Sequence, residues 1–477
     1  MNYKTILSTL GGVLKIEAGC MILPLICSLI YNDGQALVFL SCILLCLLSG
    51  ICLNLFRPKN KNLYAKEGFI IVALSWILIS IYGALPFIFS GYIKSFPDAL
   101  FETVSGFTTT GASILADVEA LPKSLLFWRS FTHWIGGMGV LVFLVALFPA
   151  SGGSNLHIIK AESPGPQVSK IVPKIRQMAK ILYGLYILFT VMEIVFLLAG
   201  GMSVFDALTT AFGTAGTGGF GIKNSSIAEY SPYIQIVVTI FMILFGVDFS
   251  VYYLFATRKF KSAVRSEEVR IYFGIILLSI IIIAFNTRGL FSTVSETIRH
   301  SAFQVGSIIT TTGFATTDFD KWPELSKFIL VTLMFIGACA GSTGGGIKVS
   351  RILILFKSLL KEIKIAPHPR VTHKLSMNDR PIAHETIRAV NTFLVAYIFI
   401  YFASVMLISI DNFDFTTNFT AVAATLNNIG PGLSGVGPTQ NFSAYSDFSK
   451  FVFIFDMLVV RLEIFPVLVL FSRYTWK

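Results

Sequence analysis

TVSGFTTTGAS, at positions 103–113, is the stretch that decides the fold, because altered copies of it occur three more times in the chain. The other copies read AFGTAGTGGFG (211–221), SIITTTGFATT (307–317) and TLNNIGPGLSG (425–435). We take one glycine as the centre of each copy: Gly111, Gly216, Gly313 and Gly430. Every copy lies between two long apolar segments, so the sequence predicts four re-entrant loops around a common axis.

Glycine at the centre of each loop suits an ion filter. Backbone carbonyls replace an ion's hydration shell when consecutive peptides turn the same way, which requires φ > 0 and no Cβ in the pore. One such stretch alone is more typical of close helix packing, but four in equivalent places favour a filter. The candidate filter residues are Thr110, Gly111, Ala215, Gly216, Thr312, Gly313, Ile429 and Gly430, with Thr109, Thr311 and Asn428 beside them.

Composition excludes a soluble globular protein. The 477 residues are 54% hydrophobic and 13% charged, with a mean hydropathy of +0.75, and apolar runs of spanning length recur throughout. The six cysteines lie in apolar segments without metal-ligand or disulfide spacing, and no cleavable leader is expected. The chain is therefore predicted to be an all-α polytopic membrane protein that remains in the lipid bilayer.

The apolar runs predict about ten spans. They are placed at 5–30, 35–56, 67–90, 125–149, 181–200, 232–256, 271–286, 326–357, 389–410 and 448–472. The arrangement is an extra N-terminal helical pair followed by four repeats of helix, re-entrant pore loop and helix. The corresponding units are 1–60 for the pair, then 61–155, 156–265, 266–365 and 366–477 for the four pore repeats.

The basic residues predict the orientation. One set of loops and the C-terminal tail carry 24 Lys and Arg residues, whereas the opposite loops carry 8. The loops of the first set are 57–66, 151–180, 257–270 and 351–388. By the positive-inside rule both termini are cytoplasmic and the glycine loops enter from outside. The net charge of +11 is thus a topology signal, and no nucleic-acid partner is expected.

Short helices are expected to lead down to each glycine, over 97–107, 204–212, 293–308 and 414–426. Asp98 and Asp206, each in a DAL triplet, are candidates to cap the first two. These triplets lie 13 and 10 residues before Gly111 and Gly216, so the repeats do not align without a gap. Four helix C-termini that converge on the membrane centre would stabilise a cation there.

GACAGSTGGGIK at 337–348 predicts a broken helix within the eighth span. Consecutive glycines weaken a helix by about 1 kcal/mol each, and unwound backbone is tolerated at membrane depth only inside protein or beside a water-filled cavity. We expect 341–346 to face the pore below the filter, with helix packing as the alternative. A phosphate-binding loop is excluded because Ile347 separates the glycines from Lys348.

Arg461 lies near the middle of the last span, where an arginine must face a cavity or a partner. It is a candidate gate or barrier, or else an anchor for neighbouring carbonyls, and Glu463 is not an automatic partner. Arg129 and His133 share one helical face and are expected to be structural. The candidate gate residues are Gly341, Ser342, Thr343, Gly344, Gly345, Gly346, Lys348 and Arg461. The sequence contains no recognisable pairing of a nucleophile with a base, so no enzyme activity is expected.

Several stretches resemble the Trk/Ktr/HKT superfamily of potassium transporters, specifically its bacterial TrkH-type subunits. They are FETVSGFTTTGAS (101–113), LPKSLLFWRSFTHWIGGMGVLVF (121–143), TAGTGGF (214–220), ITTTGFATTDF (309–319), AGSTGGGIKVSR (340–351), NNIGPGLSGVGP (427–438) and RLEIFPVLVLF (461–471). The resemblance covers nearly the whole chain, and the extra pair at 5–56 is similar to the Trk branch.

The resemblance implies a potassium-selective, gated pore in the bacterial cytoplasmic membrane, with potassium ions at the four filter glycines and no covalent cofactor. It places the gating loop at about 340–346 and the pore arginine at Arg461. It also implies a homodimer and a cytosolic, nucleotide-binding TrkA-type regulatory subunit. Val460 departs from the glycine expected before the arginine.

A second hypothesis is a cation-coupled secondary potassium transporter, driven by sodium or protons, with alternating access. Broken helices suit both mechanisms, but such transporters usually have two inverted halves with one broken helix in each. Four loops that all enter from outside favour the pore.

Overall fold

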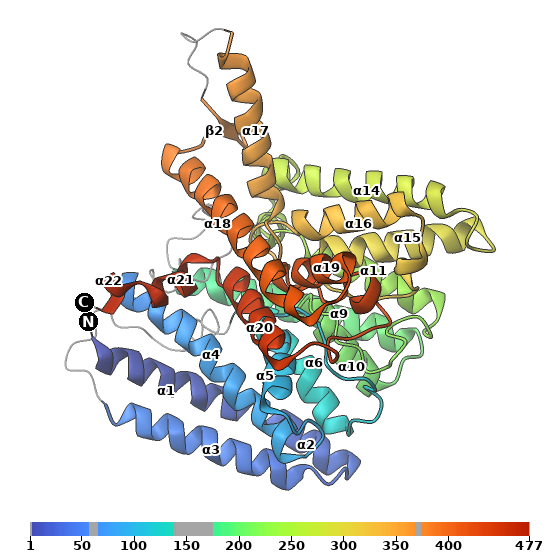
Figure 1. Cartoon of the computed structure of the whole chain (residues 1–477). Coiled ribbons are helices and arrows are strands. Elements are labelled where there is room, and N and C mark those ends of the chain that lie inside the picture. The colour runs from blue at the N-terminus through green and yellow to red at the C-terminus, as the bar shows by residue number, and fades with distance from the viewer. Residues whose placement is uncertain (1, 57–64, 138, 140–174, 368–373, 477) are drawn as a thin grey trace.

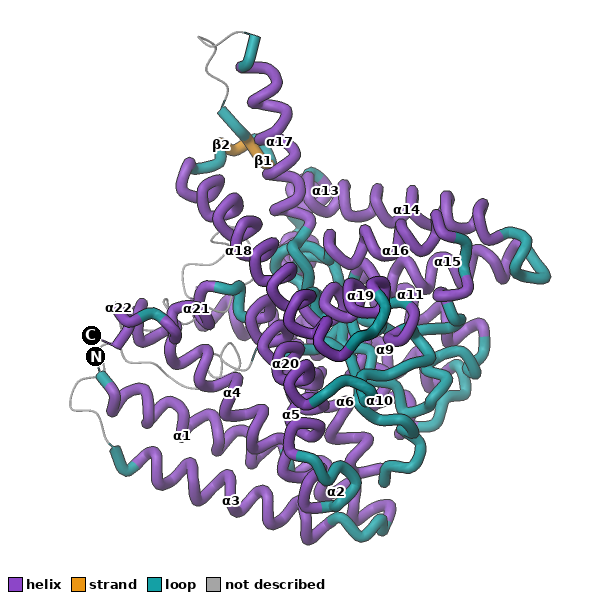
Figure 2. Tube along the Cα trace, viewed as in Figure 1, coloured by secondary structure: helices purple, strands orange, loops and turns teal. Residues whose placement is uncertain are grey.

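The computed structural model of the chain describes residues 2–56, 65–137, 139, 175–367 and 374–476. The described part is built almost wholly of helices, and its strands form one short hairpin of β1 (Ser376–Met377) and β2 (Arg380–Pro381) (Figures 1 and 2). The predicted unit boundaries at 60/61 and 155/156, and most of the basic loops at 57–66 and 151–180, lie outside these residues.

An N-terminal group of helices precedes the repeats. It consists of α1 (Tyr3–Cys20), α2 (Ile22–Tyr31) and α3 (Ala36–Asn54). The backbones of α1 and α3 pack closely where Gly11 faces Gly50, since a methyl group on Gly11 would lie 2.7 Å from the Gly50 carbonyl oxygen. Small residues permit such close packing of membrane helices. This group lies beside α4 (Figure 1).

Four further groups follow, each with a long helix, a short helix and a third helix. The first has α4 (Ala65–Phe89), α5 (Phe96–Phe107) and α6 (Lys123–Gly137). The second has α9 (Ile175–Ala199), α10 (Val204–Ala215), α11 (Pro232–Phe245), α12 (Phe249–Ala256) and the connecting α13 (Phe260–Val264). The third has α14 (Glu267–Thr287), α15 (Val294–Ile309), η1 (Phe319–Lys321), α16 (Glu324–Ile336) and α17 (Val349–Ile365). The fourth has α18 (His384–Ile408), η2 (Ser409–Asp411), α19 (Phe415–Leu426), η3 (Ser434–Val436), α20 (Asp447–Arg461), α21 (Phe465–Phe471) and α22 (Arg473–Trp476).

Six helical stretches among the described residues are long and apolar enough to span a membrane. They are Tyr3–Tyr31, Ala36–Asn54, Lys66–Phe89, Ala179–Ala199, Glu267–Thr287 and His384–Asp411. A seventh candidate combines α11 and α12, which meet at a 91° bend. These stretches correspond to seven of the ten predicted spans.

The predicted spans 232–256, 326–357 and 448–472 are not continuous helices. The break in 326–357 was expected from its glycines, whereas the breaks in 232–256 and 448–472 were not. The helix ends at Phe245, Ile336 and Arg461 in these three spans, and α6 of the first group ends at Gly137. Glycine follows the helix at Gly246 and Gly337, and Glu463 and Ile464 both have positive φ after Arg461. Beyond Gly137 the predicted span 125–149 lies, except for residue 139, outside the described residues.

Serines rather than aspartates hold the N-caps of the first two short helices. Ser95 precedes α5 and Ser203 precedes α10, so Asp98 and Asp206 lie in the first turn of each helix instead of capping it. The Ser203 hydroxyl accepts the Asp206 N–H over 3.1 Å, and Asp98 pairs with Lys450 of α20 at 2.6 Å. The acidic residues still lie where the helix dipole favours negative charge.

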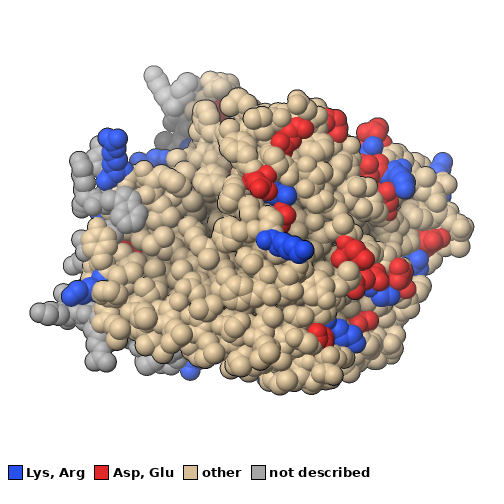
Figure 3. Space-filling view, turned by 60° about the horizontal axis from the view of Figure 1, so that its bottom comes forward, with Lys and Arg blue, Asp and Glu red and all other residues tan. Residues whose placement is uncertain are grey.

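The outer surface is that of a membrane protein. Figure 3 shows a broad area without charged side chains, next to a side on which acidic and basic side chains are interspersed. Large apolar side chains are exposed on the long helices, among them Leu37, Leu48, Leu277 and Phe399. The lower ends of α17 and α18 join the main body, and their other ends project away from it with the β1–β2 hairpin (Figure 1).

Candidate functional site

The four short helices end in one shared backbone motif. We call the four segments that follow them, residues 108–111, 216–219, 310–313 and 427–430, the glycine turns. In the first, the Thr110 N–H donates to the Ser105 carbonyl over 2.9 Å and the Thr109 N–H donates to the Gly106 carbonyl over 3.1 Å. The other three turns make the same two bonds. This is the Schellman pattern, which requires one residue in the left-handed region.

Threonine or asparagine, rather than glycine, occupies that left-handed position. Thr109, Thr217, Thr311 and Asn428 have φ between 54° and 58°. Threonine is β-branched and rarely adopts positive φ, so the surrounding packing must fix these turns. Two residues later comes a glycine that also has positive φ: Gly111 (78°), Gly219 (72°), Gly313 (83°) and Gly430 (99°).

The second turn is therefore centred on Gly219, and its predicted placement at Ala215 and Gly216 is wrong by three residues. Gly216 has φ −70° and is the C-cap of α10, in the place that Thr108 has after α5. A side chain on Gly216 would collide with the backbone carbonyl of His133, so close helix packing accounts for this glycine. Ala215 is the last residue of α10.

The sequence contained a signal that would have given the correct register. With Gly219 as the central residue, Asp206 precedes it by 13 residues, as Asp98 precedes Gly111. The two DAL triplets then align without a gap.

The four glycine turns form a closed ring. A methyl group on Gly111 would overlap the carbonyl oxygen of Gly218, one on Gly219 that of Thr312, and one on Gly313 that of Ile429. A methyl group on Gly430 would lie 2.9 Å from the Thr110 carbonyl oxygen, which returns the ring to the first turn. Each turn thus meets the next in chain order, and the four surround one axis. A side chain at any of the four glycines would therefore clash with the backbone of a neighbouring turn.

A cavity of about 160 Å³ lies on one side of the ring. All four positive-φ glycines line it, together with residues that follow them, such as Ser113, Ala315 and Pro431. The chain segments beyond the turns therefore form a vestibule that leads to the ring.

The hydroxyl pattern divides the four turns into two kinds. In the first turn Thr108 and Thr110 share a hydroxyl hydrogen bond of 2.8 Å, and in the third Thr310 and Thr312 share one of 2.7 Å. Glycines replace both threonines in the second turn. In the fourth, the Asn428 amide donates to the Thr110 hydroxyl over 2.8 Å, which links the last turn to the first.

The broken segment 337–348, between α16 and α17, packs against the opposite side of the ring. The Gly346 N–H donates to the Asn427 carbonyl over 3.1 Å, and the Gly345 N–H donates to the Thr311 hydroxyl over 2.6 Å. A methyl group on Gly344 would lie 2.8 Å from the Thr310 carbonyl oxygen. The consecutive glycines thus let this loop fit directly under the C-terminal ends of α15 and α19.

Arg461 joins this loop to the first group of helices. Its guanidinium donates to the Thr343 carbonyl over 3.0 Å and to the carbonyls of Gly136 and Gly137 over 2.5 and 3.2 Å. Lys348, which is buried with φ 86°, donates from its ammonium group to the Gly344 carbonyl. The predicted gate residues therefore come together around one loop, and Glu463 pairs with Arg351 of α17.

Glu268 is a residue of this site that the sequence reasoning missed. One carboxylate oxygen of this α14 residue accepts the Ala340 N–H over 2.7 Å and the Ser350 N–H over 3.0 Å. These two residues flank the glycine-rich part of the loop, so one side chain holds both of its ends. An acidic residue at the start of a predicted span looks like an ordinary interfacial charge, so the sequence carries no signal for it.

Comparisons with known proteins agree with this architecture. The family model for TrkH, described as a cation transport protein, matches residues 35–475. The Trk system potassium uptake protein TrkH of Escherichia coli K12 is 36% identical over the full length of both chains, and TrkG of the same organism is 33% identical over 98% of this chain and 97% of its own. The crystal structure of the potassium transporter TrkH from Vibrio parahaemolyticus superposes with a TM-score of 0.90 and 31% identity over the whole of both chains. Because these are transport proteins, the chain is a multi-pass membrane protein and not an enzyme. It belongs to the TrkH family of cation transport proteins.

Proposed function

We propose that the protein takes up potassium ions through a gated, potassium-selective pore that runs along the axis of the four glycine turns. The observation that carries the proposal is the closed ring, in which each glycine faces a carbonyl oxygen of the next turn. Carbonyl oxygens around one axis can replace the hydration shell of a monovalent cation. The relatives named above as potassium uptake proteins support potassium as the ion.

The proposed filter consists of the residues at and before each positive-φ glycine: Thr109, Thr110, Gly111, Thr217, Gly218, Gly219, Thr311, Thr312, Gly313, Asn428, Ile429 and Gly430. Potassium is the transported ion here and not a resident cofactor. The C-termini of α5, α10, α15 and α19 lead into the ring, and each carries roughly half a negative charge. Their combined field favours a cation on the axis without any acidic side chain in the filter.

The proposed gate is the loop at 341–346, held by Lys348 and Arg461. It lies under the third and fourth turns, where the N–H groups of Gly345 and Gly346 are already bound. In this position the loop occupies the path of an ion that has passed the ring. Deleting residues 342–345 should raise basal flux, and unchanged flux in a folded protein would count against a gate here.

The competing mechanism is a secondary transporter that couples potassium to sodium or protons. The decisive measurement is uptake into liposomes that contain the purified protein alone, under an imposed negative-inside potential. A pore should take up rubidium without a required co-ion, and potassium but not sodium should block this uptake. Rubidium uptake that needs a sodium or proton gradient would contradict the pore and establish coupled transport.

Assembly and orientation complete the proposal. The protein would form a homodimer in the cytoplasmic membrane, with both termini and the projecting ends of α17 and α18 in the cytoplasm, and bind a TrkA-type regulatory subunit there. Exposed apolar residues on α17 support a protein contact: Phe356, Leu359, Leu360 and Ile363. The start of α1 and helix α22 lie on the same side of Figure 1, which supports this orientation. Light scattering of the detergent-solubilised protein tests the dimer.

A further inference from the structure

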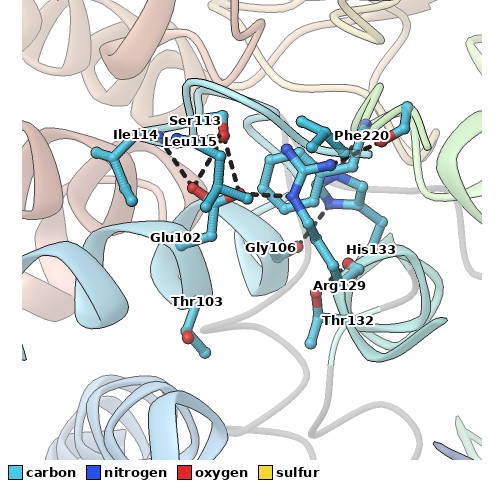
Figure 4. Close-up of polar contacts among 12 residues, drawn as sticks. Glu102, Thr103, Gly106, Ser113, Ile114, Leu115, Arg129, Thr132, His133 and Phe220 are labelled. Carbon is cyan, nitrogen blue, oxygen red and sulfur yellow. Dashed lines mark hydrogen bonds and ion pairs between the residues drawn. The ribbon is translucent and has the colours of Figure 1, made fainter. Parts of the chain in front are cut away.

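A buried ion pair lies behind the first two glycine turns. The Arg129 guanidinium Nε of α6 lies 2.6 Å from the Glu102 carboxylate of α5, and the two side chains are 3% and 0% exposed (Figure 4). Burial of two charges is costly unless further hydrogen bonds satisfy the remaining donors and acceptors. The other partners of this pair are therefore informative.

Glu102 holds the segment that leaves the first turn. The Ser113 hydroxyl lies 3.0 and 3.1 Å from the two carboxylate oxygens, and the Ile114 N–H donates to one of them over 3.0 Å. Ser113 and Ile114 are the second and third residues after Gly111 (Figure 4). Arg129, Ser113 and Ile114 together occupy both carboxylate oxygens, so Glu102 is not placed to bind an ion itself.

Arg129 holds the segment that leaves the second turn. Its guanidinium donates to the Gly221 carbonyl over 2.8 Å and lies over the Phe220 ring at 3.5 Å. One helical turn further along α6, His133 Nε2 accepts the Phe220 N–H over 3.2 Å, and its Nδ1 lies 2.7 Å from the Gly106 carbonyl. Since Nε2 accepts, Nδ1 carries the proton and donates to Gly106. Phe220 and Gly221 directly follow Gly219.

We propose that Glu102 and Arg129 are positioning residues for ion selection, because their pairing fixes the exits of the first and second turns relative to each other. The inference rests on the proposed function, since it deepens the account of the filter. A filter discriminates between ions of different radius only if its carbonyls keep their spacing or their number around the ion. The ion pair supplies a charge-assisted link between two of the four turns.

The other repeats lack this link among the described residues. The position nine residues before the positive-φ glycine holds Glu102 in the first repeat, and Thr210, Gln304 and Ala421 in the others. Gln304 is fully buried, and neither of its amide atoms makes a hydrogen bond there. The third turn is instead bound by the loop at 337–348. The ring thus has one side fixed by an ion pair and another side in contact with the proposed gate.

The test compares Glu102→Gln, Arg129→Gln and the double variant by the ratio of rubidium to sodium uptake in liposomes, with thermal stability measured alongside. Each single variant should lower the ratio about tenfold, which corresponds to one lost hydrogen bond to a charged group. The double variant should be no less selective than the worse single variant, because both changes break the same link. Ser113→Ala, which keeps the ion pair, should lower the ratio by a smaller factor.

Asp98→Asn is the matched control. Asp98 lies one turn before Glu102 on α5 and pairs with Lys450, although the Asp98 side chain is 25% exposed. Among the described residues neither side chain is hydrogen-bonded to a glycine turn. The ratio of rubidium to sodium uptake in Asp98→Asn should equal that of the unmodified protein, even if the thermal stability of the variant falls. An unchanged ratio in Glu102→Gln and in Ser113→Ala, or an equal fall in Asp98→Asn, would overturn the inference. Failure of the proposed function differs visibly, since the unmodified protein would then show no potassium-blocked rubidium uptake.

Discussion

The Gly345 N–H donates a hydrogen bond to the Thr311 hydroxyl over 2.6 Å, which ties the loop at 337–348 to the third glycine turn. Thr109 and Thr217 have nearly the same backbone conformation in their turns, but their hydroxyls bond to the preceding carbonyls of Thr108 and Gly216 over 2.7 and 2.6 Å. The same residue type at the same position therefore has two different roles. In the third turn it connects the proposed filter to the proposed gate.

Thr311→Val should raise basal rubidium flux in the absence of any regulatory subunit. Valine keeps the shape and the β-branching but cannot accept the Gly345 N–H, so the loop loses about 1 kcal/mol of attachment and is released about fivefold more often. Liposome flux measures the effect. Thr109→Val is the control, because its hydroxyl does not reach the loop, and an equal rise in both variants would show that the loss of a threonine hydroxyl, rather than loop release, is responsible.

Gly219→Ala and Gly216→Ala should have different effects, although both introduce one methyl group. Alanine at position 219 would have to adopt an unfavourable φ of 72°, and its methyl group would overlap the Thr312 carbonyl oxygen. Potassium selectivity should therefore fall at least tenfold. At Gly216 the methyl group would displace the His133 carbonyl, so the yield of folded protein should fall. The ratio of rubidium to sodium uptake in the protein that does fold should change less. Uptake ratios normalised to folded protein distinguish the two. A larger selectivity loss at Gly216 would restore the original placement of the second filter segment.

The sequence predicted the fold class, the short helices and three of the four ring glycines, because each depends on a local pattern. Gly111, Gly313 and Gly430 each lie four residues after the end of a short helix, and this arrangement repeats with the hydrophobic segments. Gly219 was missed because three glycines within four residues, Gly216, Gly218 and Gly219, compete for one position. In the sequence only the 13-residue spacing from Asp206 distinguishes them, and in the structure the contacts of His133 with Gly216 and Gly218 do so.

The helix break after Arg461 and the long-range partners of the loop could not be predicted from the sequence. The many glycines at 337–348 predict the break in that segment. The break after Arg461 occurs at Glu463 and Ile464, two residues with no intrinsic preference for positive φ. Tertiary contacts enforce that conformation. The same holds for Glu268, whose role depends on Ala340 and Ser350 being brought to it by the loop.

Glu268→Leu should raise basal flux and lower the thermal stability. Leucine leaves the N–H groups of Ala340 and Ser350 without an acceptor, at about 1 to 3 kcal/mol each for a buried donor. Glu268→Gln should stay close to the unmodified protein, because its amide oxygen still accepts. Glu267→Leu, next to it on α14, removes the contact with Lys357 and serves as the control. If Glu268→Leu has the same basal flux as the unmodified protein, the Glu268 carboxylate does not hold the loop.

Uptake should be insensitive to external pH between 8 and 5. Asn224 of the second repeat donates from its amide to Asp117 of the first over 2.8 Å, and this hydrogen bond lowers the pKa of Asp117 below its ordinary value of 3.8. A depressed pKa means that the stabilising contact is complete above the ordinary value and is lost only as the pH falls through the lower, folded value. Rubidium uptake at stepped external pH tests this. A midpoint near pH 6 would show that another group at the outer surface controls the flux.

Arg461→Gln should increase basal flux more than Arg461→Lys does, because the guanidinium bridges two elements. It donates to the loop at Thr343 and to the end of α6 at Gly136 and Gly137. Glutamine is shorter and uncharged and cannot reach both, so the loop loses its attachment to the first group of helices. Lysine keeps the positive charge but lacks the planar fork, so it should retain the electrostatic barrier while losing part of the bridge. Single-channel recording separates the two contributions, because a lost bridge raises the open time and a lost charge raises the conductance. If Arg461→Gln changes only conductance, the arginine acts as a barrier to the ion and not as the latch of the loop.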